Sequence, residues 1–271
     1  MPKFRVLSLS LMSYFLISSG SIAFAETLAL EEIIVTAKRS EMALQDAAIA
    51  VSVTSGDDFD RSNILKLDNF NGYTPGLVVA KNDGAGRVVS IRGVGWETAQ
   101  NIASQPSVLT YIDGLYLANP LSMGLDLGEL ERIEVFRGPQ GTEFGQGTTG
   151  GAINLVTKKP VLEETKGYAE VGIGNYDSVN ARAAFNIPLN DTAALRASFQ
   201  KHTRDGFSEI KGGDLNGYGL DDADSFSGRL ALLWEPSDSL SILLQAFAHE
   251  SDQNAAAQKN IDDPNPNPRE L

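Results

Sequence analysis

From residue 166 onwards, apolar and polar residues alternate with a period of two. Segments 166–175, 179–187, 193–200, 226–234 and 240–249 place an apolar or small side chain at almost every second position. Such alternation indicates β-strands, because successive side chains of a strand point to opposite faces. Leu233, Leu243 and Phe247 fall on the otherwise polar side. The pattern predicts five antiparallel strands with one apolar and one polar face.

Two architectures produce this alternation. A transmembrane barrel turns its apolar face to lipid and its polar face to the lumen, whereas a soluble sandwich buries the apolar face. Segments of about ten residues suit barrel strands, and Trp234 fits an interfacial aromatic girdle. The turns at 187–191 and 235–239 are short, while 204–224 is long and polar, as expected for periplasmic turns and an external loop. We expect a barrel, and the sandwich stays as the alternative.

Residues 41–160 show a different pattern, in which short apolar runs alternate with turn sequences such as Asn71-Gly72 and Asp113-Gly114. A turn over 55–59 is expected to lead into a short helix with Asp or Ser as the cap, and a second short helix is expected over 64–70, where every third residue is apolar. The runs predict a small α+β domain with strands over 48–53, 78–80, 87–93, 132–136 and 152–157 and a strand followed by a turn within 108–116.

A glycine-dense loop separates the last two of these strands. It contains Gly138, Gly141, Gly145, Gly147, Gly150 and Gly151. Glycine permits positive φ angles and close backbone approach, so we expect a tightly packed loop. Residues 145–150 also match the G-x-G-x-x-G pattern of dinucleotide-binding folds, but that motif must open a helix, whereas here a strand is predicted next. Nucleotide binding is therefore not expected.

The N-terminus has the features of an export signal. Lys3 and Arg5 precede an apolar stretch over 6–17, and Ala23-Phe24-Ala25 forms an A-x-A cleavage site. This stretch is about 12 residues long, whereas a transmembrane helix needs about 20. We expect cleavage after Ala25.

A β-prone run follows the predicted cleavage site, in the sequence EEIIVTAKR over 31–39. We expect it to have no pairing partner nearby in sequence. A free strand of this kind can add to the edge of another protein's sheet through main-chain hydrogen bonds. The alternative is an ordinary first strand of the following domain.

Composition excludes several functional classes. The chain has 22 basic and 35 acidic residues, and removal of residues 1–25 takes away two basic ones and leaves a net charge of −15. This acidity disfavours a nucleic-acid partner. Cysteine is absent and only His202 and His249 are present, so no disulfide or metal site is predicted. No catalytic constellation and no cofactor site is recognised, and we do not expect an enzyme.

Several motifs in order resemble the TonB-dependent outer-membrane receptors. They are the TonB-box-like EEIIVTA, the IRG of 91–93, the YIDG of 111–114 and the ERIEVFRGP of 131–139. The resemblance implies a signal peptide (1–25), a TonB-box segment (26–40), a plug domain (41–160) and the first strands of an antiparallel transmembrane β-barrel (161–271). Energised uptake of a scarce nutrient, such as an iron–siderophore complex, is the implied function.

The resemblance also implies roles for particular residues and partners. The TonB-binding residues would be Glu32, Ile33, Ile34, Val35, Thr36 and Ala37. Arg92 and Arg137, each expected on a largely enclosed strand, would meet glutamates of the barrel wall as a plug–barrel lock, the alternative being a local pair with Glu131 or Glu134. The implied partners are TonB with the ExbB–ExbD inner-membrane complex, outer-membrane lipid and an extracellular small molecule.

Two plug loops, 81–87 and 96–106, are candidates for contact with that small molecule. Trp96, Gln100 and Asn101 are the side chains suited to stacking and hydrogen bonding, although simple loop packing is the plainer interpretation of each.

The number of strands departs from the family pattern. A plugged outer-membrane barrel has about 22 strands, and five cannot close around a plug. The sequence therefore predicts a truncated receptor that lacks most of its barrel. A secreted or surface β-rich binding protein without energised transport is the alternative, and a third hypothesis is that this chain has no activity of its own.

Overall fold

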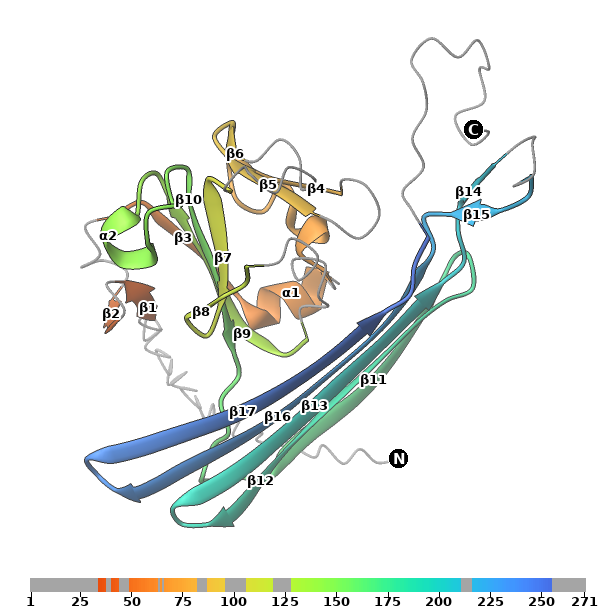
Figure 1. Ribbon diagram of the computed structural model, residues 1–271. Helices are drawn as coiled ribbons and strands as arrows, with labels where there is room; N and C mark the ends of the chain where they lie inside the picture. Colours follow the sequence, from red (N-terminus) through yellow and green to blue (C-terminus); the bar gives the residue numbers. More distant parts are fainter. Residues whose placement is uncertain are drawn as a thin grey trace, which may run out of the picture. The chain divides into compact units, whose positions relative to one another are not determined.

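The computed structural model describes residues 34–37, 40–43, 49–62, 64, 66–81, 87–95, 106–118, 128–210 and 216–254 of the 271-residue chain. Two five-stranded sheets dominate this part of the protein, one within residues 51–157 and one within 166–251 (Figure 1). None of the helices in the described ranges has the length and apolar character needed to cross a membrane.

The first large sheet has the strand order β3-β9-β10-β7-β8. Its strands are β3 (Val51–Ser55), β7 (Val108–Ile112), β8 (Leu115–Tyr116), β9 (Leu130–Arg137) and β10 (Gly151–Thr157). Only the β10–β7 pairing is parallel. The strands predicted over 132–136 and 152–157 are confirmed, and the segment predicted over 108–116 is a strand, a turn at Asp113-Gly114 and a second strand.

Both faces of this sheet are buried, and the period of two assigns alternate residues to different cores. Ile133, Val135 and Ile153 pack with the helical residues Phe59 and Phe70 in one hydrophobic cluster. Sheet residues on the other face form a second cluster together with Phe144, and its buried members are Leu109, Tyr111, Phe136, Phe144 and Ala152. All seven residues of β10 are buried as a result. The sheet is thus the centre of a layered α+β domain.

The predicted short helix is present as α1 (Gly56–Ser62), but it begins within the segment predicted as a turn. The Ser55 hydroxyl accepts a hydrogen bond from the Asp58 backbone N–H at 3.3 Å and donates one to the Asp58 carboxylate at 2.7 Å. This reciprocal arrangement satisfies a backbone donor that the first turn would otherwise leave unpaired. Ser55 is therefore the helix cap, and serine was one of the two residue types predicted for that role.

The second predicted helix, over 64–70, is largely wrong. Only a 3₁₀ turn, η2 (Leu67–Phe70), is present, because Lys66 has an extended backbone (φ −135°, ψ 158°). The Asn71 side chain then pairs with both backbone groups of Val79 in the following strand. The expected apolar face is nevertheless correct, since Ile64, Leu67 and Phe70 share the first cluster.

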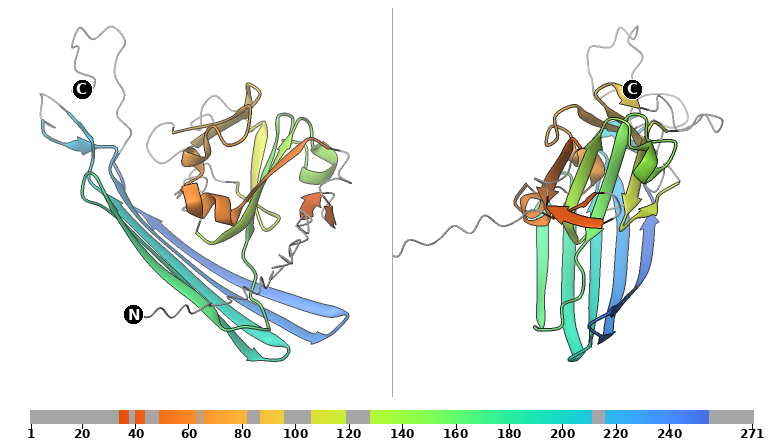
Figure 2. Two further views of the ribbon diagram at one scale, coloured as in Figure 1. Left: turned by 180° about the vertical axis from the view of Figure 1, so that it is seen from behind. Right: turned by 90° about the vertical axis from the view of Figure 1, so that its left-hand side faces the viewer.

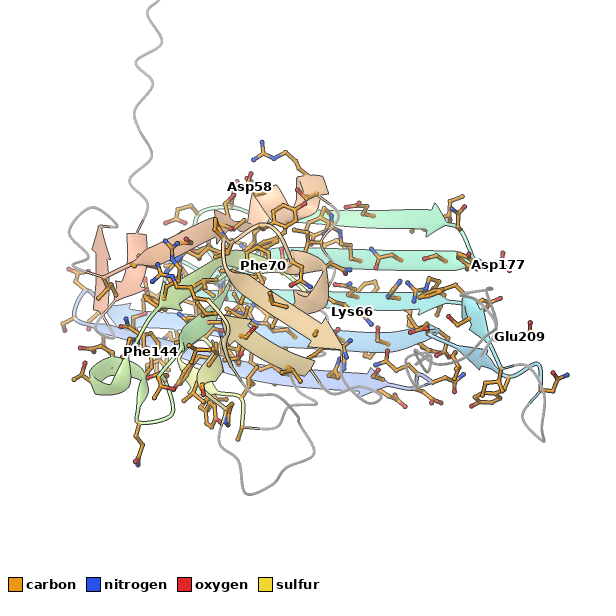
Figure 3. All side chains as sticks on the ribbon, turned by 90° about the horizontal axis from the view of Figure 1, so that it is seen from above. Asp58, Lys66, Phe70, Phe144, Asp177 and Glu209 are labelled. Atoms are coloured by element: carbon orange, nitrogen blue, oxygen red, sulfur yellow. The ribbon has the colours of Figure 1, made fainter. Side chains whose placement is uncertain are left out.

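A small antiparallel sheet covers part of that cluster. Its strands are β4 (Leu77–Lys81), β5 (Arg87–Ile91) and β6 (Val94–Gly95). Leu77, Val79, Val89 and Ile91 contribute alternate side chains to the core. A second short helix, α2 (Gly141–Phe144), lies within the glycine-dense loop and supplies Phe144 to the other cluster (Figure 3). The loop is packed, as predicted.

The second large sheet contains five antiparallel neighbours in the order β11-β12-β13-β16-β17. These are β11 (Lys166–Gly174), β12 (Ser178–Asn190), β13 (Ala193–Arg204), β16 (Ala223–Ser237) and β17 (Leu240–Ser251). All five predicted strands are therefore present, with the longer ones extended by a few residues. The long connection after β13 holds a two-stranded ribbon, β14 (Ser208–Glu209) and β15 (Gly219–Leu220), which the sequence did not predict.

Figure 2 shows these strands side by side in two further views. The outer edges of β11 and β17 pair with no other strand among the described residues, so the sheet is open there. This agrees with the expectation of a few barrel strands in place of a closed cylinder.

The two faces of this sheet have a polarity opposite to that of a soluble protein. Large apolar side chains lie on one face and are exposed: Val179, Phe185, Phe199, Leu230, Trp234 and Leu244. Polar side chains on the opposite face are buried: Asn180, Asn186, Gln200, Ser225 and Arg229. A sandwich would bury the first set, because burial of apolar area is what stabilises it. The arrangement is that of a barrel wall.

Candidate functional site

The predicted TonB-binding segment lies only partly within the described residues. Glu32 and Ile33 fall outside them, while Ile34, Val35, Thr36 and Ala37 form strand β1 (Ile34–Ala37). This strand pairs antiparallel with β2 (Ser40–Ala43), with Val35 opposite Met42 and Ala37 opposite Ser40. The expectation that the segment has no partner nearby in sequence is therefore wrong. One edge of β1 is occupied, and its backbone is already extended.

Arg92 does not lie on an enclosed strand, as the sequence had suggested. Strand β5 ends at Ile91, and Arg92 adopts a left-handed conformation (φ 54°) followed by Gly93 (φ 79°). The turn leads into β6, and the Arg92 backbone N–H donates to the Gly76 carbonyl at 2.7 Å. Arg92 is exposed at this turn.

Arg137 closes strand β9 and is half-buried. Its Nε atom is buried and has no hydrogen-bond partner among the described residues. Arg132 contacts both carboxylates of the local alternative. Its Nε donates to Glu134 at 2.8 Å and its Nη1 to Glu131. The role of Arg137 as a lock residue stays a prediction.

The three candidate ligand-facing residues, Trp96, Gln100 and Asn101, lie outside the described residues, as do 82–86 of the other candidate loop. Strand β5 begins at Arg87, strand β6 ends at Gly95, and the two strands are neighbours in one small sheet.

The glycine pattern over 145–150 leads directly into strand β10, as predicted. Gly151 has a φ of +148°, and a side chain there would come within 2.2 Å of the Phe136 carbonyl oxygen. A Cβ on Gly150 would approach the Val94 carbonyl to 2.9 Å. These glycines permit close packing of backbone on backbone, which is a structural role.

A plug–wall ion pair was missed by sequence reasoning. Arg196 of β13 donates from Nε to Glu129 at 2.7 Å and from Nη2 to the other carboxylate oxygen. Glu129 immediately precedes β9, and its side chain is only 2% exposed. The bidentate geometry satisfies both buried groups. The one available signal was an arginine among the polar positions of a predicted barrel strand.

A cavity of about 210 Å³ lies beside this pair. Its walls include Leu115, Leu155 and Thr157 from the first sheet, and Arg229 and Phe247 from the second. The Asp113 carboxylate accepts hydrogen bonds from Thr157 N at 2.9 Å and Thr157 Oγ1 at 2.7 Å, which ties the β7–β8 turn to the end of β10. Partial burial raises the pKa of Tyr116 in the same hairpin. The cavity is mainly apolar.

Comparisons with known proteins identify the first domain. Residues 43–152 match the family model described as "TonB-dependent Receptor Plug Domain". The vitamin B12 transporter BtuB of Vibrio vulnificus is 27% identical over 84% of this chain and 36% of its own length. The pesticin receptor of Yersinia pestis is 30% identical over 63% of this chain and 25% of its own length. The chain thus spans about a third or less of these relatives.

Solved structures show the same fold. The ferric yersiniabactin uptake receptor FyuA from Yersinia pestis superimposes with a TM-score of 0.69 and 23% identity, over 76% of this chain and 32% of that receptor. The ferripyoverdine receptor of the outer membrane of Pseudomonas aeruginosa gives a TM-score of 0.65 over 81% of this chain. With a plug-type domain followed by five barrel-type strands, the chain resembles the N-terminal part of TonB-dependent receptors.

Proposed function

We propose that the chain acts in energised uptake of a scarce nutrient across the bacterial outer membrane. The observation that carries the proposal is the sheet that follows the plug, because its apolar face is exposed and its polar face is buried. That polarity suits a wall between lipid and a polar interior. The predicted signal peptide over 1–25 supports export, and the plug supports a gated passage.

The proposed mechanism uses strand addition at β1. TonB, energised through ExbB–ExbD, would pair with residues 32–37, and a pull on this segment would rearrange the plug. Strand β1 is already extended, so little further ordering is needed when a partner strand is added. The partner either joins the edge of β1 that β2 leaves free or displaces β2. A two-stranded hairpin is only marginally stable by itself, so displacement costs little.

Binding to the purified TonB C-terminal domain tests this mechanism. Val35→Pro removes a backbone donor from the strand, so we expect affinity to fall at least tenfold. Val35→Thr is the matched control, because it keeps the donor and the β-branched shape. Equal binding by Val35→Pro and the unchanged chain would exclude strand pairing at this segment.

Membrane fractionation separates the receptor from the alternative of a secreted binding protein. The receptor proposal expects the chain with outer-membrane lipid, whereas a secreted protein would remain in the soluble fraction and show no affinity for TonB. A chain that binds TonB but takes up no ligand would support the hypothesis that these 271 residues are inactive alone.

For the ligand we propose a ferric siderophore, since relatives include the ferric-pyoverdine 358 receptor of Pseudomonas putida and the ferrioxamine receptor of Yersinia enterocolitica. Trp96, Gln100 and Asn101 are the proposed contacts. Trp234→Phe leaves Trp96 as the single tryptophan, so quenching of its fluorescence reports binding. Quenching by ferric siderophores would support the proposed ligand class. Quenching by cobalamin and not by ferric siderophores would contradict it and indicate cobalamin as the ligand.

Arg92 and Arg137 are proposed to hold the plug through glutamates of the wall. The exposed Arg92 side chain and the unpaired Arg137 Nε support this role. Arg92→Gln and Arg137→Gln are expected to increase protease cleavage of the plug. Arg61→Gln, an exposed arginine of α1, is the control.

A further inference from the structure

The connection between the plug and the sheet is held by side chains of the wall. Strand β10 ends at Thr157 and β11 begins at Lys166. Residues 158–165 form no helix or strand, so their backbone groups need other partners. Three neighbouring strands each send one polar side chain to this region. The side chains from β12 and β16 contact the connection itself, and the side chain from β13 contacts Glu129, whose carbonyl accepts a hydrogen bond from Lys158.

Asn186 of β12 makes the largest number of these contacts. Its Oδ1 accepts from the Val161 N–H at 3.0 Å, and its Nδ2 donates to the carbonyls of Val161 at 2.8 Å and Glu164 at 2.7 Å. Asn186 is fully buried. A side-chain amide here replaces a neighbouring strand, because it satisfies both backbone groups of Val161 at once.

The two arginines hold the adjacent part of the plug. Arg229 of β16 donates from Nη1 to the Lys158 carbonyl at 2.9 Å. The Lys158 N–H donates to the Glu129 carbonyl at 3.1 Å, and the Glu129 side chain receives Arg196. Arg196 lies opposite Ala231 and Arg229 opposite Ser198, so the two arginines are diagonal neighbours on one face. The two arginines therefore contact one region, in which Glu129 just before β9 lies next to Lys158 just after β10.

We propose that Asn186, Arg196 and Arg229 form a fixed anchor for the root of the plug, defined as Glu129 and residues 158–164. The charges are the reverse of the proposed Arg92 and Arg137 lock, since here the cations belong to the wall and the anion to the plug. A buried ion pair resists separation, because either partner left alone is a charge without compensation. The root therefore stays on the wall while other parts of the plug rearrange.

Amide hydrogen exchange on the full chain in detergent micelles tests the anchor. Asn186→Leu should raise the exchange rate of the Val161 amide at least tenfold, because its acceptor is lost. Asn180→Leu is the matched control, since Asn180 lies on the same face of β12 and is buried, but it accepts a long hydrogen bond from Gln200 at 3.5 Å and does not contact the connection. Unchanged exchange at Val161 in Asn186→Leu would overturn the proposal.

A double-mutant cycle tests the ionic half. Glu129→Gln and Arg196→Gln should each raise the exchange rate of the Lys158 amide, and the double variant should raise it no more than one single change does. If the double variant raised the exchange rate by the product of the two single effects, the proposed coupling between Glu129 and Arg196 would be overturned. If Arg196→Gln fails to fold, Arg196→Lys keeps the charge and removes the bidentate contact, and exchange at Lys158 should still rise. Neither experiment uses TonB or a ligand. A negative result would therefore overturn the anchor without bearing on the proposed uptake function.

Discussion

The plug sheet requires glycine at position 151, because a side chain there would not fit. The φ of +148° and the approach of the Phe136 carbonyl leave no room for a Cβ atom. We expect Gly151→Ala to lower the free energy of unfolding by about 2–4 kcal/mol, since backbone strain and a clash within the ladder act together. Urea denaturation in micelles measures the change.

Gly141→Ala is the control for that substitution. Gly141 begins α2, and nothing lies within 4 Å of the position where its Cβ would be built. The control should be neutral or slightly stabilising, because alanine favours helix. A comparable loss in both variants would contradict the packing argument for Gly151.

Asp58 offers a titration at the start of α1 (Figure 3). The hydrogen bond from Ser55 holds the pKa of Asp58 below its usual value, with a further contribution from the positive charge of Arg61. Because the folded-state pKa is lowered, the carboxylate stabilises the helix above the unfolded-state pKa, and that contribution disappears as the pH falls through the folded value. We expect Ser55→Ala to raise the pKa of Asp58, as measured by carbon NMR. An unchanged pKa would remove Ser55 as its cause.

Single residues also mark the limit of sequence reasoning. An Asp or Ser cap near residue 55 could be predicted because capping is local, with both partners within three residues. Arg92 was misplaced because the exact end of a strand depends on the turn that follows it. The Glu129–Arg196 pair joins residues 67 positions apart, and no local pattern specifies which charge meets which.

Among elements, the barrel strands were predicted best. Their alternation is a property of each strand alone, and it fixes which side chains share a face. The β1–β2 hairpin gave no such signal, because its link, Lys38-Arg39, lacks the glycine or asparagine of favoured two-residue turns. The ribbon β14–β15 was missed for a similar reason, since two-residue strands carry too little pattern.

Substitutions on the apolar face of the sheet should depend on depth in the bilayer. Leu230 lies in the middle of β16 and Leu240 beside the β16–β17 turn, and both are 48% exposed. Leu230→Arg should cost about 2–4 kcal/mol of stability in lipid vesicles, and Leu240→Arg about 0–1 kcal/mol. Denaturant unfolding from vesicles gives both values. Equal costs would contradict a lipid-facing surface.

At the scale of the whole molecule, the exposed apolar face decides how the chain behaves in water. Exposed apolar surface of this extent favours association, so we expect large assemblies in detergent-free buffer and dispersed particles in micelles. Analytical ultracentrifugation distinguishes these states. A monodisperse monomer without detergent would favour the secreted binding protein.

The two faces of the β11–β17 sheet should also differ in the substitutions that they tolerate. Side chains on the outer face need only be apolar, so Leu, Val, Ile and Phe are nearly interchangeable there. The inner face must match particular atoms, such as the Val161 backbone or the Glu129 carboxylate. A library that randomises β12 and β13 should therefore tolerate many exchanges at alternate positions and very few between them.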